Sequence, residues 1–175
     1  MKDLLLITPP FTQLNTPYPA TAYLKGFLNT KNISSYQIDL GIEVILEIFS
    51  KKGVTEIFNV KPKNLSENAH RIFALREEYI KTIDEVIAFL QNKKPTLARQ
   101  ICSMNFLPEA SRFNQLDDME YAFGNMGLQD KAKHLATLYL EDLSDYIIEN
   151  IDENFGFSRY AERLGRSANS FDELY

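Results

Sequence analysis

The apolar run Leu4-Leu5-Leu6-Ile7 constrains the fold more than any other stretch of this chain. A short, uninterrupted apolar run is typical of a strand that is covered on both faces, as in a parallel sheet. Pro9 and Pro10 follow it and end the strand, because proline has no N–H to donate to a neighbouring strand. We therefore predict a buried strand over residues 3–8.

A helix and a second strand are predicted next. Tyr36 to Leu40 alternates between polar and apolar residues, which indicates a strand. Before it, apolar residues recur at helical spacing, with Pro17 or Pro19 tolerated in the first turn; they are Ala20, Tyr23, Leu24, Phe27 and Leu28. Two strands joined by one helix are expected to be parallel, with a right-handed connection. Residues 1–41 are thus a predicted βαβ unit.

Residues 42–175 are predicted to be mostly helical and continuous with that unit. One helix is expected to end at Lys51-Lys52-Gly53, with the glycine just past its last turn. A long helix is expected from a capping box at Asn64 and Glu67 to about residue 92. Shorter helices are expected over roughly residues 54–62 and near Pro95, and a further helix over 129–150. Residues 105–127 are expected to be irregular. The expected fold class is α/β, rich in α-helix.

Composition excludes several classes of protein. The net charge is −5 and the lysines are scattered, whereas nucleic-acid binding needs a concentrated basic stripe. No apolar run approaches the length of a membrane span, and the first residues do not form a signal peptide. The one cysteine, Cys102, rules out internal disulfides and a cysteine-built metal site. We take the cytoplasm as the default compartment.

Residues 4–41, "LLLITPPFTQLNTPYPATAYLKGFLNTKNISSYQIDLG", closely resemble the N-terminal cobalamin-binding domain of radical SAM enzymes. That family has an apolar strand, Asn/Thr-Pro-Pro, a proline-containing loop, a helix of the AYLxxxL type and a second strand that ends in Asp. Here these are Thr8-Pro9-Pro10, Ala22-Tyr23-Leu24 with Leu28, and Ile38-Asp39. The stretches "AFGNMGLQDKAKHLATLYLEDLSDY" and "FGFSRYAERLGRSANSFDELY" also look like a helical insertion found in a subgroup of that family.

The resemblance implies a Rossmann-like or flavodoxin-like domain that binds cobalamin, and a parent protein with a separate catalytic domain. The iron–sulfur cluster and S-adenosylmethionine would belong to that catalytic domain, because Cys102 alone cannot supply the Cys-x-x-x-Cys-x-x-Cys motif. The Asp-x-His-x-x-Gly motif that places histidine under cobalt is also absent. Many members of the resembled family lack it too, so no metal ligand is predicted and no catalytic residue is assigned.

The candidate cofactor-binding residues lie where parallel strands present ligands, beyond their carboxyl ends. A loop rich in proline and poor in glycine suits a broad, apolar macrocycle better than a diphosphate. Asn15, Thr16 and Thr21 are candidates to hydrogen-bond its amide arms, Tyr18 to lie on its face, and Pro10 to pack against it. The same polar residues can instead make turn bonds and cap the helix. Asp39 and Gly41 complete the candidate set, although Asp39 is favoured as a helix cap at Gly41.

Two functions from different classes remain open. The chain is either the non-catalytic, cobalamin-binding front of a radical SAM enzyme, or a helical interaction and packing module whose βαβ opening has lost its ligand. The capping box Ser170-Phe171-Asp172-Glu173 predicts that a helix begins there and that the parent chain continues. Cobalamin and the remainder of the parent chain are the expected partners. We also expect the 175-residue chain to form a homo-oligomer, because the first strand has an unpaired edge.

The acidic residues near the end of the 129–150 helix are a final candidate cluster. They are Glu141, Asp142, Asp145 and Glu149. A di-iron site would need Glu-x-x-His pairs, and His134 lies too early in the sequence to form one. The sequence therefore predicts a solvated acidic face here, with His70 and His134 at the surface or its boundary.

Overall fold

The computed structural model describes residues 4–10, 19–62, 65–103, 105–118 and 127–157, and leaves the side chains of 115–118 undescribed. The chain divides into two compact units, the first made of residues 1–47 and 154–175 and the second of residues 48–153. The predicted α/β class, rich in α-helix, is confirmed.

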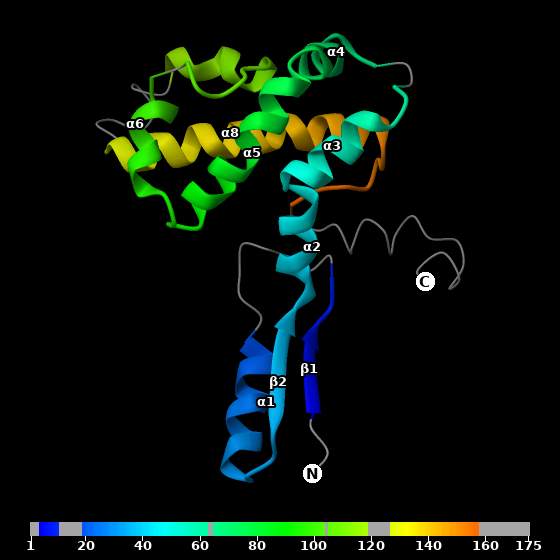
Figure 1. Ribbon diagram of the computed structural model, residues 1–175, viewed down its shortest axis with the longest axis vertical. Coiled ribbons are helices and arrows are strands. Elements are labelled where there is room, and N and C mark those ends of the chain that lie inside the picture. Colours follow the sequence, from blue (N-terminus) through cyan, green and yellow to red (C-terminus); the bar gives the residue numbers. More distant parts are fainter. Residues whose placement is uncertain (1–3, 11–18, 63–64, 104, 119–126, 158–175) are drawn as a thin grey trace. The chain divides into compact units, whose positions relative to one another are not determined.

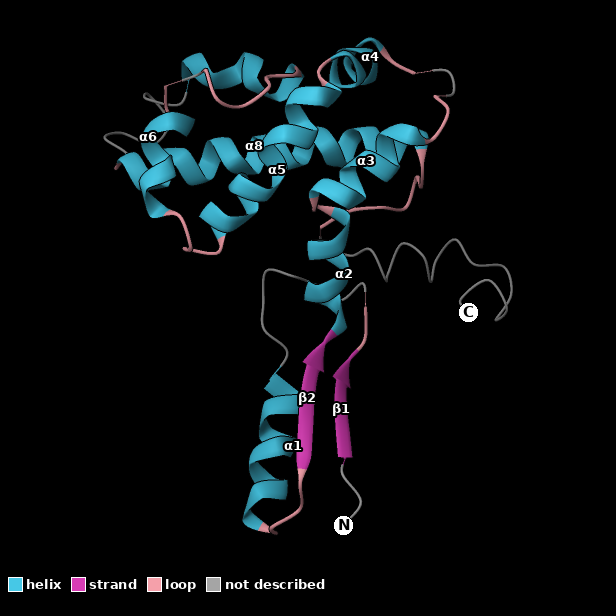
Figure 2. Ribbon diagram, in the orientation of Figure 1, coloured by secondary structure: helices cyan, strands magenta, loops and turns pink. Residues whose placement is uncertain are grey.

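The first unit holds the predicted βαβ arrangement. Strand β1 (Leu4–Thr8) is followed by helix α1 (Pro19–Thr30) and strand β2 (Ser35–Asp39), and the chain then enters α2 (Leu40–Ile48). The two strands are parallel, as expected, and their register places Thr8 beside Asp39. Figure 2 shows the strands side by side with α1 along them. Pro19 is the first residue of α1, where a missing N–H costs nothing.

Helix α1 does not turn its apolar stripe toward the sheet. Its buried residue is Thr21, whereas Tyr23, Leu24 and Phe27 are 78%, 52% and 59% exposed. Gln37 of β2 explains this orientation, because its Nε2 donates a 2.9 Å hydrogen bond to Thr21 Oγ1. A polar contact thus joins helix and sheet. Tyr23, Leu24 and Phe27 of the apolar stripe thus lie on the outer side of the helix, whereas Leu28 is half-buried.

The second unit is helical (Figure 1). Its elements are α3 (Lys51–Asn59), α4 (Glu67–Ala74), α5 (Arg76–Leu90), the 3-10 turn η1 (Pro95–Leu97), α6 (Ala98–Ile101), the 3-10 segment η2 (Ser111–Asp118) and α8 (Leu128–Asn150). The long helix α8 contacts α4, α5, α6 and η2. Fully buried aromatic side chains from different helices, among them Tyr79 and Tyr139, fill the interior. The rings of Tyr79 and Tyr139 lie 5.0 Å apart.

The expected helix end at Lys51-Lys52-Gly53 is wrong. These residues begin α3, and Ser50 precedes them as its N-cap, with an extended backbone (φ −104°, ψ 162°). The Ser50 Oγ accepts a 3.0 Å hydrogen bond from the Gly53 N–H, which satisfies one of the free donors of the first turn. Asp84 of α5 accepts from the Lys51 N–H at 2.8 Å. The glycine therefore starts a helix here and does not terminate one.

The single helix expected from about residue 67 to 92 is two helices. Leu75 leaves helical geometry (φ −90°, ψ 11°) and separates α4 from α5. No glycine or proline marks this break. Both helices contact α8, and α5 contacts α3 as well. Ser66 caps α4 through a 3.2 Å bond from the Ala69 N–H, while Asn64 of the expected capping box lies outside the described residues.

None of the helices in the described parts of the chain combines the length and the apolar character needed to cross a membrane.

The α2–α3 junction yields a stability prediction. Replacing Ser50 with Ala removes the acceptor for the Gly53 N–H and should lower the free energy of unfolding by about 1 kcal/mol. Ser50→Asp keeps an acceptor at the N-cap and should retain most of the stability. Urea denaturation followed by circular dichroism measures both. Equal loss in the two variants would contradict the assignment of Ser50 as a cap.

Candidate functional site

The candidate ligand-binding site lies at one end of the sheet, beyond the carboxyl ends of β1 and β2. Because Thr8 and Asp39 are register partners, the Pro9-Pro10 turn and the start of α2 leave the sheet next to each other. Thr8 is buried and Pro10 is half-buried. Gly41 is buried in the first turn of α2. The structure thus brings together the predicted positions Pro10, Asp39 and Gly41 at one end of the sheet.

Thr21 belongs to the same end through its contact with β2. Its Oγ1 accepts from Gln37, which lies two residues before Asp39 on the same side of the strand. A hydroxyl that accepts one hydrogen bond still has its own proton to donate. Thr21 therefore keeps a donor, although the residue is 9% exposed. Gln37 was not among the predicted site residues; its position at i−2 from Asp39 in an alternating strand was the available signal.

Asp39 has a structural role. Its Oδ1 accepts a 3.1 Å hydrogen bond from the Ile42 N–H, so it caps the N-terminus of α2. This confirms the cap favoured by the sequence. The remaining predicted residues, Asn15, Thr16 and Tyr18, lie in the segment 11–18 outside the described residues. Their role in a site stays a prediction.

The face of the sheet opposite α1 is apolar and exposed. Gln37 points to α1, so its neighbours in the alternation, Tyr36 and Ile38, point the other way together with Leu5 and Ile7. Leu5, Ile7 and Tyr36 are 59%, 46% and 59% exposed. One face of this sheet is therefore covered by a helix and the other carries a patch of apolar side chains.

The acidic residues of α8 do not form the expected solvated face. Asp142 is 0% exposed. Its two carboxylate oxygens accept from the backbone N–H groups of Ala110, at 3.3 Å, and Arg112, at 3.4 Å. The intervening N–H of Ser111 donates to Asn68 Oδ1 of α4 at 3.1 Å. Three consecutive backbone donors at the start of η2 are thus bound by side chains of two helices.

The other acidic side chains are paired as well. The Arg112 guanidinium donates to Asp145 at 2.8 Å through Nε and again through Nη2, and to Glu141 at 2.9 Å. Glu149 accepts from the Ser66 hydroxyl at 2.7 Å and from the Ser66 N–H. His70 is exposed and His134 half-buried, as predicted. Hydrophobic spacing alone does not reveal such pairing, because the partners lie 29 to 83 residues away in the sequence.

Burial controls the acid–base properties of this cluster. Desolvation raises the pKa of Asp142 to about 6 from an ordinary value of 3.8; the two backbone N–H bonds oppose this shift and the nearby Asp145 charge adds to it. Burial, followed by the Asp142 charge, also raises the pKa of Tyr79. The cluster holds no nucleophile with an orienting base, and its chemistry is that of a buried structural carboxylate.

The surface grooves of the described helical unit include two open ones. One is lined by Ser50, Lys51, Lys52, Thr55, Glu56 and Asp84. The first-turn N–H of Lys51 is already bound by Asp84, so an anion would have to displace a carboxylate. The other groove is lined by Pro95, Thr96, Ala98, Arg99, Leu128 and Gln129. Among the lining residues of the two grooves there is no nucleophile paired with an orienting base.

The titration of Asp142 should make the free energy of unfolding depend on pH. A folded-state pKa above the ordinary value means that the folded chain binds the proton more tightly, so this contribution to stability is fully present below about pH 4 and is lost as the pH rises to about 6. The wild-type chain should therefore lose on the order of 1–2 kcal/mol of unfolding free energy between about pH 4 and pH 6, and Asp142→Asn should not show this loss. Urea unfolding of both proteins between pH 4 and 7 tests it. Parallel stability curves would refute the assignment.

The described residues contain no group of three or more His, Cys, Asp or Glu side chains able to hold a metal ion. We predict that the purified chain binds no metal tightly, because one cysteine and two separated histidines supply too few soft or imidazole ligands. Elemental analysis of freshly purified protein is the measurement. Stoichiometric zinc or iron would contradict the prediction.

The chain was compared with protein-family models, with curated proteins and with solved structures. None of these comparisons gave a match.

Proposed function

We propose that this chain supplies the first βαβ unit of a cobalamin-binding domain, and that its parent protein is a radical SAM enzyme in which this part is not catalytic. The observation that carries the proposal is the parallel β1–α1–β2 unit, with Thr8-Pro9-Pro10 and Asp39 at adjacent strand ends. Ligands of parallel α/β sheets bind beyond those ends. The order of strand, proline loop, helix and Asp-terminated strand is the order of the resembled family.

The open face of the sheet gives further support. A two-stranded sheet is marginal by itself, and a doubly wound domain places helices on both faces. Here α1 covers one face, while Leu5, Ile7 and Tyr36 remain exposed on the other. These side chains are what the first two strands of a larger parallel sheet would present to further elements of a parent domain.

The described residues fit cobalamin in a limited way. Pro10 offers an apolar ring, and Thr21 retains a hydroxyl proton to donate to an amide arm. Asp39 contributes through its cap, which sets the start of α2 beside the site, and Gly41 lies in that first turn. Asn15, Thr16 and Tyr18 would complete the contacts. When bound, cobalamin would carry a methyl group or assist other radical chemistry; the iron–sulfur cluster and S-adenosylmethionine belong to the catalytic part of the parent.

The test is the cobalamin content of the parent protein. Purified from cells supplied with hydroxocobalamin, it should retain about one cobalamin per chain, seen in its visible spectrum after gel filtration. Thr21→Val removes the hydroxyl donor and should lower the retained cobalamin several-fold. Thr55→Val on α3 is the matched control, because the Thr55 hydroxyl donates only to the Lys51 carbonyl of its own helix.

A colourless parent protein, or one without Cys-x-x-x-Cys-x-x-Cys, would refute the proposal. The alternative, a helical packing module with a βαβ unit that binds no cofactor, would then be favoured. Its supporting observation is that Asp39 and Gln37 already make hydrogen bonds inside the unit.

A further inference from the structure

Strand β1 has a free edge within the part of the chain that the structure describes. The described sheet contains β1 and β2 only, so each strand has one unpaired side. Figure 1 shows β1 with α1 and β2 on one side of it. The sequence of β1, LLLIT, carries no charge, proline or bulge of the kind that protects edge strands. An edge of this type is a template for another strand.

The pairing pattern identifies which backbone groups are available. Leu4 donates its N–H to the Ser34 carbonyl at 3.1 Å, so the backbone groups of Leu4 point toward β2. Alternate residues of a strand point their N–H and C=O groups to opposite sides. The backbone N–H and C=O groups of Leu6 and Thr8 therefore also point to β2. The backbone N–H and C=O groups of Leu5 and Ile7 point to the free edge.

We propose that the 175-residue chain forms a two-fold symmetric dimer in which β1 pairs antiparallel with β1 of a second copy. The Leu5 and Ile7 backbone groups of one copy then bond to the Ile7 and Leu5 groups of the other. The product is a four-stranded sheet in the order β2-β1-β1-β2. Such a sheet exceeds the two strands that are marginal alone.

The chemistry of the strand selects one register. A two-fold axis at Leu6 overlaps all five residues of β1 and places Leu5 beside Ile7 of the second copy, an apolar cross-strand pair. An axis at Ile7 would set Leu5 against Pro9, which has no N–H to donate. An axis at Leu5 would set Ile7 against the charged Asp3. The Leu6-centred register is therefore favoured.

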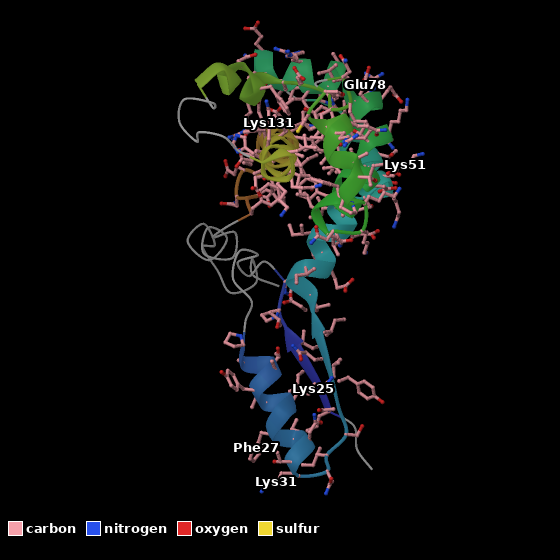
Figure 3. All side chains as sticks on the ribbon, turned by 90° about the vertical axis from the view of Figure 1, so that its left-hand side faces the viewer. Lys25, Phe27, Lys31, Lys51, Glu78 and Lys131 are labelled. Atoms are coloured by element: carbon pink, nitrogen blue, oxygen red, sulfur yellow. The ribbon has the colours of Figure 1, made fainter. Side chains whose placement is uncertain are left out.

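Charge complementarity favours a second copy in this antiparallel orientation. Lys31 follows the last turn of α1, near the amino ends of the strands (Figure 3). Asp39, Glu43 and Glu47 lie at or beyond the carboxyl end of β2. Antiparallel pairing sets the basic end of each copy beside the acidic end of the other, whereas parallel pairing would place like charges together. The attraction is modest at physiological salt.

This inference does not rest on cobalamin binding. A further strand of a parent domain would use the same edge, so the two uses exclude each other, and the dimer belongs to the 175-residue chain. The choice of β1 over β2 follows from composition, because β2 carries Gln37 and Asp39 whereas β1 is apolar up to Thr8.

Light scattering coupled to gel filtration tests the oligomeric state. At high micromolar concentration the chain should elute with twice the monomer mass. Tyr36→Ser, on the same open face but on the other strand, should leave the dimer intact. A wild-type chain that remains monomeric would overturn the proposal whatever the variants do.

A single cysteine then tests the edge and the register together. In a Cys102→Ser background, Leu6→Cys places two cysteines opposite each other at a non-hydrogen-bonded pair, with Cα atoms about 4.5 Å apart, within the range of a disulfide. Mild oxidation should give a covalent dimer on a non-reducing gel.

The matched control is Leu5→Cys in the same background. Leu5 is the more exposed side chain, yet the register puts it opposite Ile7 of the second copy, so it should cross-link roughly tenfold more slowly than Leu6→Cys. Faster cross-linking of Leu5→Cys, in variants whose circular dichroism matches the wild type, would overturn the Leu6-centred pairing.

Discussion

The parallel pairing of β1 with β2 is the constraint on which the first unit depends. The register sets Thr8 beside Asp39, and this adjacency brings the Pro9-Pro10 turn and the start of α2 to one end of the sheet. Without that register the candidate residues would be scattered along 41 residues of sequence. The same pairing also leaves one edge and one apolar face open, since two strands cannot enclose a core by themselves.

A polar contact inside this unit determines which side chains of α1 are buried and which are exposed. The Gln37–Thr21 bond orients α1 so that Thr21 is buried and Tyr23 and Phe27 are exposed. Exposed apolar stripes of this kind are expected on a unit that packs against further protein. The proposed cobalamin domain and the proposed dimer are two ways to meet that requirement, and they differ in what occupies the edge of β1.

In the helical unit, the buried carboxylate of Asp142 joins α8 to the start of η2. Asp142 loses hydration in the interior, which raises its pKa, and recovers part of that cost by accepting from two backbone N–H groups at the start of η2. Arg112, whose N–H is one of those donors, also pairs with Glu141 and Asp145. Asp142, Glu141 and Asp145 of α8 thereby hold the start of the 3-10 segment η2 against the long helix.

Local pattern in the sequence determined the strands, their parallel order, the positions of most helices and the capping role of Asp39, because strand alternation, proline and helix caps act over a few residues. Tertiary structure alone decided the rest. Ser50 began a helix where Gly53 indicated an end, and Leu75 divided α4 from α5 without a glycine or proline. The outward stripe of α1 and the burial of Asp142 depended on Gln37 and on Ala110 and Arg112, partners distant in sequence whose hydrogen bonds outweighed the local pattern.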